Sequence, residues 1–245
     1  MERLSLRVLD QANTLSGQGA GRNTMGTMRR RDVLQIGTVL GVIGTVSPLQ
    51  FSVAQTTLPR TPEQILGPFY PAGRSPNPGA DLTRMPGKPG QAAGQVINVI
   101  GRVLNVHGEP VRGARLEIWQ ANTYGRYTHP ADRNPAPIDP NFDGFAVIHA
   151  DEEGRYKFKT IKPGAYPTGP NTMRPPHIHF RMTGHEDELV TQLYFDGEPL
   201  NDKDPLLQSV APSRRMLLVA KMLAPPDGFE RDSKLVVFDI VTLRG

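Results

Sequence analysis

The chain has 245 residues, of which 38% are hydrophobic, 25 are glycine and 24 are proline, which favours a single β-rich domain with one sizeable core. The absence of cysteine excludes a disulfide framework and a thiolate metal site. Residues 1–54 carry six arginines and three acidic residues, and so account for +3 of the formal net charge of +4, leaving no basic footprint for nucleic acid in the remainder.

The N-terminal segment has the parts of a secretory leader of twin-arginine type. An arginine cluster at positions 29–31 precedes a modest apolar run, and residues 52–54, Ser-Val-Ala, form a small-x-small cleavage site. We therefore predict that residues 1–54 are an export leader, with the true start at Met25 or Met28, and that the protein is periplasmic or otherwise exported. Because the apolar run is short and rich in glycine, membrane association is expected only if the leader stays uncleaved.

The next segment, residues 55–94, is dense in proline and glycine and shows no sustained hydrophobic period. We predict an extended arm over the core. From residue 95 onward, short apolar runs alternate with turns, so residues 95–245 are predicted to form an all-β sandwich with long loops. Strands are expected at 95–106, 115–122, 145–150, 155–161, 177–182, 189–195 and 234–243, with one helix or broken helical turns within 204–223.

The stretch "RPPHIHF" at residues 174–180 places two histidines two positions apart. Its proline pair prevents a helix, so a strand is expected. On a strand His177 and His179 share one face, while the apolar residues beside them face the opposite layer. Two imidazoles side by side have the geometry of a metal pair, although alternating histidines also occur as ordinary hydrogen-bonded residues.

Two loop tyrosines could complete a metal site, although each has an ordinary alternative. Tyr127 follows the strand that carries Trp119 and could simply close over the core, and Tyr166 in "KPGAYPTGP" could be a surface residue of a turn. A phenol with a pKa near 10 becomes an anionic ligand only beside a strong Lewis acid. Phenolates with imidazoles and no thiolate suit Fe(III) better than zinc or copper. Of the other histidines, His129 could line a pocket.

Several ordered blocks of the sequence resemble the intradiol ring-cleavage dioxygenases over roughly residues 95–210, most of all the β-chain type of the protocatechuate 3,4-dioxygenase branch. The blocks are "RLEIWQAN", "GRYTH", "DPNFDGF", "DEEGRYKFKTIKPGAYP", "RPPHIHF" and "TQLYFDGEPL". The resemblance implies a β-sandwich that holds non-haem Fe(III) through two tyrosines and two histidines. It also implies cleavage of a catechol-type diol by O2, between its two hydroxyls, to a cis,cis-muconate-type diacid.

Block by block, the resemblance also implies roles for individual residues. The iron ligands would be Tyr127, Tyr166, His177 and His179. Tyr166 would be the ligand that the substrate displaces and that takes a substrate proton. Arg174 would lie near the diol and stabilise its anionic charge, Gln192 would be a polar residue of the pocket, and Trp119 would pack nearby.

The same resemblance leaves the substrate open. Protocatechuate-type members usually carry tryptophan where this chain has Thr168 and Met173. Gln192 favours a protocatechuate-like substrate, as does the short arm, which leaves no room for the helical dimerisation segment of simple catechol enzymes. Tyr70 in the arm could be a pocket residue. An oligomer is expected, either of this chain alone or beside an α-like chain.

Two other hypotheses remain at this point. A non-catalytic β-sandwich module, exported to the periplasm, could use "GRVLNVHGEPVRGARLEIW" as the centre of a scaffold that binds a carbohydrate or a protein. A different iron or copper oxygenase would fit if Tyr127 or Tyr166 were not a ligand. Colour distinguishes the dioxygenase from the non-catalytic module. Charge transfer from tyrosinate to Fe(III) would make the dioxygenase reddish, whereas the module would be colourless.

Overall fold

The computed structural model describes residues 57–77 and 79–245, so the predicted leader with its arginines at 29–31 lies outside the described residues. The described residues form a mostly β structure, which confirms the predicted fold class. The strands are β1 (Val96–Asn105), β2 (Arg115–Trp119), β3 (Phe145–His149), β4 (Arg155–Ile161), β5 (Tyr166–Gly169), β6 (Thr172–Arg174), β7 (His177–Thr183), β8 (Glu188–Phe195), β9 (Val219–Ala220), β10 (Met222–Leu223), β11 (Lys234–Val237) and β12 (Ile240–Thr242). The helical segments are η1 (Asn201–Lys203), α1 (Pro205–Gln208) and α2 (Pro212–Arg215).

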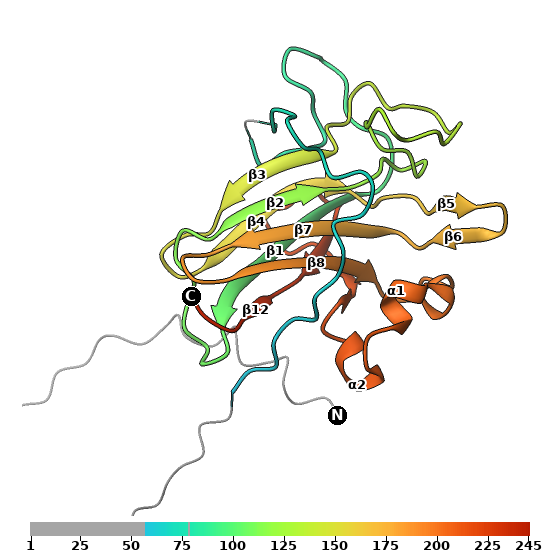
Figure 1. The fold of residues 1–245 in the computed structure, drawn as a ribbon. Coiled ribbons are helices and arrows are strands. Elements are labelled where there is room, and N and C mark those ends of the chain that lie inside the picture. The colour runs from blue at the N-terminus through green and yellow to red at the C-terminus, as the bar shows by residue number, and fades with distance from the viewer. Residues whose placement is uncertain (1–56, 78) are drawn as a thin grey trace, which may run out of the picture. The chain divides into compact units, whose positions relative to one another are not determined.

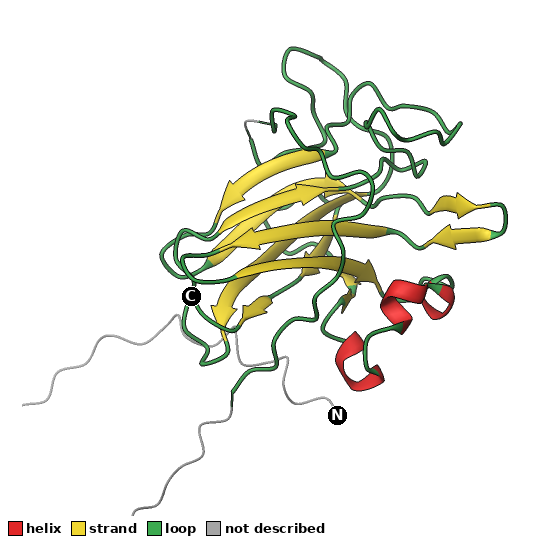
Figure 2. Ribbon diagram, viewed as in Figure 1, coloured by secondary structure: helices red, strands yellow, loops and turns green. Residues whose placement is uncertain are grey.

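Two five-stranded sheets form the sandwich (Figure 2). One has the order β3-β2-β7-β8-β9, and the other has the order β10-β11-β1-β12, with β4 also paired to β1. Apolar side chains from both sheets make one core, because alternate residues of each strand point inward. Fully buried members of this core include Ile97, Val99, Leu116, Ile118, Ile178 and Phe180.

The predicted closing strand, residues 234–243, is interrupted into β11 and β12. Both segments run parallel to β1, along its first and second halves respectively. At the interruption, the Asp239 carboxylate accepts the hydrogen bond from the Arg102 backbone N–H at 2.8 Å. The Asp239 side chain thereby takes the place of a backbone carbonyl as the acceptor, and the regular pairing with β1 is interrupted at this point.

Helical structure between residues 204 and 223 is limited to broken turns, one of the two arrangements that were expected. Pro205 and Pro212 are the first residues of α1 and α2, where a missing backbone N–H costs nothing. The chain then returns to β structure in β9 and β10. No helix in the described part of the chain is long and apolar enough to cross a membrane.

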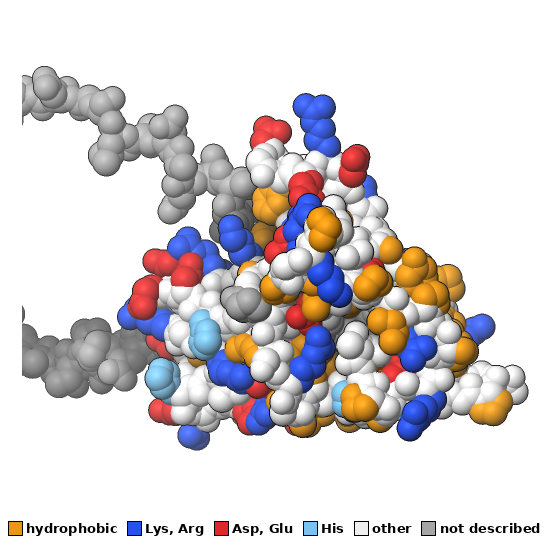
Figure 3. All heavy atoms as spheres, turned by 90° about the horizontal axis from the view of Figure 1, so that it is seen from above, with side chains coloured by type: hydrophobic (Ala, Val, Ile, Leu, Met, Phe, Trp, Pro, Cys, Tyr) orange, Lys and Arg blue, Asp and Glu red, His pale blue; other side chains and the backbone are white. Residues whose placement is uncertain are grey.

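Two features frame one end of the sheet that contains β7 and β8. The β5–β6 hairpin projects beyond the ends of these strands, beside α1 (Figure 1). The segment before β1 runs across β7 and β8 and is tied to strand backbones, with Gln64 N–H donating to Val190 O at 2.8 Å. Acidic and basic side chains are interspersed over the described part of the face in Figure 3.

Candidate active site

The strand register places five polar or aromatic side chains on one face of the sheet. His179 pairs with Trp119 on β2 and with Gln192 on β8, and His177 pairs with Tyr194 on β8. Residues directly opposite in neighbouring strands point to the same face. The opposite face of β7 carries core residues, as the alternation in "HIHF" predicted.

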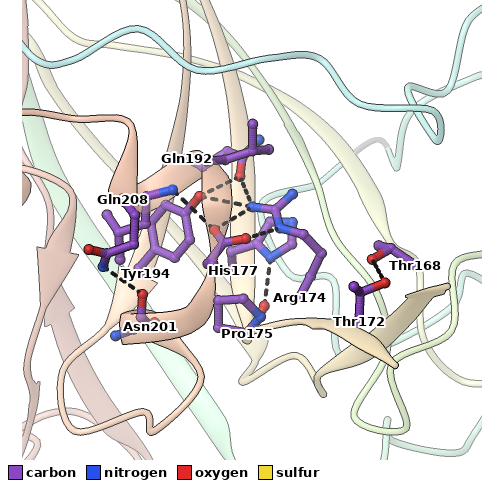
Figure 4. Close-up of polar contacts among 12 residues, drawn as sticks. Thr168, Thr172, Arg174, Pro175, His177, Gln192, Tyr194, Asn201 and Gln208 are labelled. Carbon is purple, nitrogen blue, oxygen red and sulfur yellow. Dashed lines mark hydrogen bonds and ion pairs between the residues drawn. The ribbon is translucent and has the colours of Figure 1, made fainter. Parts of the chain in front are cut away.

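The two histidines are buried and converge on each other. Their Nε2 atoms lie 3.2 Å apart. Nδ1 of His177 lies 2.7 Å from the Pro175 carbonyl oxygen (Figure 4). Because a carbonyl only accepts hydrogen bonds, this contact puts the proton of neutral His177 on Nδ1 and leaves a lone pair on Nε2.

Burial and the charge of Arg174 lower the pKa of His177 well below its ordinary value and that of His179 to about 3. Both imidazoles are therefore neutral at neutral pH, as metal ligands must be.

The two tyrosines reach the histidines from outside this sheet. The ring of Tyr166 lies 5.4 Å from that of Tyr127 in a T-shaped arrangement and 5.6 Å from that of His177. Burial, and after it the neighbouring Tyr166, raises the pKa of Tyr127 well above its ordinary value. Burial also raises the pKa of Tyr166, although the charge of Arg174 opposes this effect. Neither phenol would ionise at neutral pH unless a cation entered the site.

Close backbone approach brings the two tyrosine-bearing segments together. Gly125 has a φ of +77°, and a Cβ atom there would overlap the Ala165 carbonyl, next to Tyr166. A Cβ atom at Gly164 would likewise overlap the backbone of the Tyr127 segment. The Tyr127 backbone N–H is held by the Asp132 carboxylate at 2.7 Å. Glycine at these two positions therefore permits the approach of the tyrosines.

Aromatic side chains pack around this cluster. Trp119 stacks on His179, with centroids 4.8 Å apart and planes inclined by 10°. Phe69 lies 4.7 Å from the ring of Tyr127. Tyr70 does not line the cavity beside the site: its hydroxyl donates to Glu117 at 2.6 Å and its ring packs edge-on against Trp119. Phe69, and not Tyr70, lines this cavity, because the arm turns Tyr70 toward β2, where it packs against the aromatic cluster from the side of Trp119.

Arg174 stands at the centre of a buried polar network. Nη2 donates to Gln192 Oε1 at 2.7 Å and to the Tyr194 hydroxyl at 2.8 Å (Figure 4). The Asp204 carboxylate accepts hydrogen bonds from the same guanidinium, from Nε at 2.8 Å and from Nη2 at 3.1 Å. The sequence prediction included Arg174 and Gln192 but missed Tyr194 and Asp204. Two-residue periodicity from Gln192 could have identified Tyr194, whereas the Asp-Pro pair at 204–205 marks a helix N-cap but gives no sign that Asp204 binds Arg174.

A cavity of about 890 Å³ opens beside Tyr166 and Arg174. The β5–β6 hairpin contributes Thr168 and Met173 to its wall, and the arm contributes Phe69. Met173 is 40% exposed, so this wall is partly open to solvent. The cavity lies within the size range of small-molecule sites.

The donor set of two phenol oxygens and two imidazole nitrogens fits a hard cation. Within the described residues, no group of three or more His, Cys, Asp or Glu side chains is arranged to hold a metal. The histidine pair is instead complemented by phenols, and the Tyr127 hydroxyl and Nδ1 of His179 are buried without a hydrogen-bond partner. A buried polar atom without a hydrogen-bond partner lowers the stability of the fold. A cation bound among these residues would give the phenol oxygen of Tyr127 a partner and remove that penalty. Phenol and imidazole donors suit Fe(III).

The remaining histidines lie apart from the cluster. His107, His149 and His185 are exposed. His129 is partly buried, its ring lies 5.8 Å from that of Phe69, and it does not line the cavity. The structure thus brings together Tyr127, Tyr166, His177, His179, Arg174 and Gln192, whose roles stay predictions.

Comparison with known proteins agrees with this geometry. The sequence model of a family described as "Dioxygenase" matches residues 65–245. The protocatechuate 3,4-dioxygenase alpha chain of Burkholderia cepacia is 34% identical over 181 residues, covering 70% of this chain and 88% of the relative. The chain belongs to the intradiol ring-cleavage dioxygenase family.

Other members of the family also resemble this chain. The protocatechuate 3,4-dioxygenase beta chain of Burkholderia cepacia is 49% identical over 145 residues, covering 58% of this chain but only 62% of the relative. Two solved structures are each 26% identical. The dioxygenase domain of a carbohydrate-binding fusion from Streptomyces sp. SirexAA-E has a TM-score of 0.57, over 76% of this chain and 100% of that chain. Catechol 1,2-dioxygenase from Acinetobacter sp. ADP1 has a TM-score of 0.58, over 75% and 63%.

Proposed function

We propose that this protein is a non-haem Fe(III) dioxygenase that cleaves a catechol-type diol with O2 to a cis,cis-muconate-type diacid. The observation that carries this proposal is the convergence of two neutral histidines and two buried tyrosines beside a cavity that Arg174 also lines. Tyr127, Tyr166, His177 and His179 would hold the iron. Bound Fe(III) would supply Lewis acidity and make the chelated diol reactive toward O2.

The protein side chains then bind the diol and move its protons. Tyr166 borders the cavity and, as the phenolate that the diol displaces, would accept a proton from the diol hydroxyl. Arg174 also borders the cavity and would hold the resulting negative charge by charge-assisted hydrogen bonds. Phe69 and Met173 supply apolar walls for the ring.

A protocatechuate-like substrate, with a carboxylate on the ring, is favoured by the charges of the cavity. Arg133 and Lys203 line it, and neither side chain has an ion pair or hydrogen bond within residues 57–77 and 79–245. The lining carboxylates are engaged: Asp132 accepts two backbone N–H groups, and Asp204 pairs with Arg174. The uncompensated charge is therefore positive, which favours an anionic substituent.

Oxygen-uptake assays with the iron-loaded protein test the activity and its substrate. Catechol, protocatechuate, hydroxyquinol and substituted catechols should be compared, and protocatechuate should give the highest kcat/KM. The purified protein should be reddish. A colourless, iron-free protein that consumes no O2 with any diol would instead support the alternative, a non-catalytic β-sandwich binding module.

Assembly and location form two further parts of the proposal. The chain resembles both the alpha and the beta chain of the Burkholderia cepacia relative, which supports an oligomer of this chain alone or beside an α-like chain. Native mass spectrometry of the purified chain would distinguish these arrangements, because a monomer that lacks activity until a second chain is added indicates the mixed oligomer.

Residues 1–54 would direct export to the periplasm. Replacing Arg30 and Arg31 by lysine should retain the protein in the cytoplasm, as fractionation would measure. Unchanged periplasmic delivery would contradict the assignment of a twin-arginine leader.

A further inference from the structure

Asp204 is a fully buried carboxylate, 0% exposed, in the segment between η1 and α1. It precedes α1 as the N-cap residue, and Oδ2 accepts the Leu207 backbone N–H at 3.2 Å. Its side chain also crosses to the end of β6, where it binds Nε and Nη2 of Arg174. A helix cap alone does not require such a contact, because capping uses only the backbone N–H groups of the first turn.

The contact restricts how the guanidinium can turn. A carboxylate bound to Nε and Nη2 engages one edge of the planar fork, which holds the plane in a single orientation. The second N–H of Nη2 is directed toward Gln192 and Tyr194. Within the described residues Nη1 has no hydrogen-bond partner, and Arg174 borders the cavity. The network therefore occupies Nε and Nη2 of Arg174 and leaves Nη1 available to a ligand.

We propose that Asp204 is a positioning residue, which holds the guanidinium of Arg174 so that Nη1 faces the bound diol. This inference rests on the proposed function, in which Arg174 holds the negative charge of the diol. A buried ion pair is by itself weak evidence for stabilisation of a fold, because the cost of desolvating both charges offsets their attraction. Fixing the direction of a catalytic cation gives this pair a function beyond stability.

A double-mutant cycle on the iron-loaded full chain tests the proposal. Asp204→Asn retains a good N-cap, so the start of α1 is preserved. It should lower kcat about 10-fold to 10²-fold, the scale expected for a misplaced catalytic group, with iron content and visible colour retained. Arg174→Gln should lower kcat at least as much. Adding Asp204→Asn to Arg174→Gln should then change kcat by less than about 2-fold, because the group being positioned is already gone.

Two controls separate positioning from structure. Asp202→Asn makes the same chemical change at an exposed residue of η1 and should leave kcat unchanged. Anaerobic titration with 4-nitrocatechol, a chromogenic diol, should show for Asp204→Asn a smaller change in Kd than in kcat. A merely structural Asp204 would instead lower the melting temperature and leave kcat per bound iron unchanged.

The outcomes are distinguishable. If wild-type protein turns over a diol and Asp204→Asn keeps the wild-type kcat, or if the two substitutions multiply their effects, this inference is overturned and the proposed function survives. If wild-type protein consumes no O2 with any diol, the proposed function itself fails. Should Asp204→Asn not fold, Asp204→Glu keeps the charge and displaces the guanidinium. It should lower kcat with iron retained, and a wild-type kcat would overturn the inference.

Discussion

His177 and His179 belong to a central strand of a five-stranded sheet, whereas Tyr127 and Tyr166 lie on segments that meet through two glycines. The histidines are held by ladder hydrogen bonds on both sides of β7, and Ile178 anchors the opposite face of that strand. Tyr127 lies on a loop, where the Asp132 carboxylate holds its backbone N–H, and Tyr166 lies in the two-stranded β5–β6 hairpin, where it pairs with Arg174. The two segments meet by close backbone approach. The central strand β7 forms what we call the rigid half of the site. The loop with Tyr127 and the two-stranded hairpin with Tyr166, the proposed leaving ligand, form what we call the adjustable half.

The largest expected effect comes from removing a donor of the rigid half. His177→Ala or His179→Ala deletes a ligand on a strand that cannot re-aim its neighbour, so iron content should fall severely and turnover with it, to below about a thousandth of wild type. Metal analysis of the purified variants checks this prediction. Full iron occupancy in either variant would mean that the histidines are ordinary buried residues.

Truncating Ile178, which lies between the two histidines on the opposite face of β7, should lower stability and not iron content. Ile178→Ala empties a fully buried position of the core and should lower the free energy of unfolding by about 2 to 4 kcal/mol, with iron retained. Denaturant unfolding and metal analysis of the same preparation measure both quantities. Equal iron loss in Ile178→Ala and the histidine variants would show that a fold effect had been mistaken for ligation.

A smaller loss is expected from the adjustable half. Tyr166→Phe leaves Tyr127 and both histidines, so iron should largely stay, the visible band should weaken, and turnover should fall about 10²-fold as a positioned proton acceptor is lost. Tyr127→Phe, the matched control, should cost colour and iron affinity while leaving that acceptor in place. Stopped-flow mixing of the anaerobic diol complex with O2 would separate binding from ring attack. Full colour and wild-type turnover in Tyr166→Phe would make Tyr166 a bystander.

The smallest effect probes the contact between the two tyrosine segments. Gly125→Ala introduces a Cβ at a φ of +77°, against the Ala165 carbonyl, and should cost about 1 to 3 kcal/mol of unfolding free energy. The visible band should also shift, because the tyrosines can no longer approach as closely. Gly113→Ala is the matched control: its φ is +65° but no atom lies within 4 Å of the added Cβ. Equal losses and unshifted spectra in both variants would show that only backbone strain matters.

Much of the rigid half could be predicted from local pattern. The proline pair and the alternation in "HIHF" identify β7 and the shared face of its histidines, because strand periodicity is a local property. The same periodicity on β8 relates Gln192 to Tyr194. Tyr166 was harder: its turn-rich surroundings suggested an exposed residue, yet it is the first residue of β5 and is buried.

The sequence by itself determined the all-β class, most strand positions and, through the family resemblance, which tyrosines and histidines to consider. Only the tertiary structure decided which of two neighbouring aspartates forms the ion pair with Arg174. Asp202 and Asp204 stand two positions apart in "NDKDP". Pro205 marks Asp204 as a helix N-cap, but no local pattern indicates that it binds a guanidinium. Asp202 is exposed, whereas Asp204 is fully buried against a guanidinium 30 residues away along the chain. Burial and long-range pairing depend on how η1 and α1 dock beside β6, and no local pattern encodes that docking.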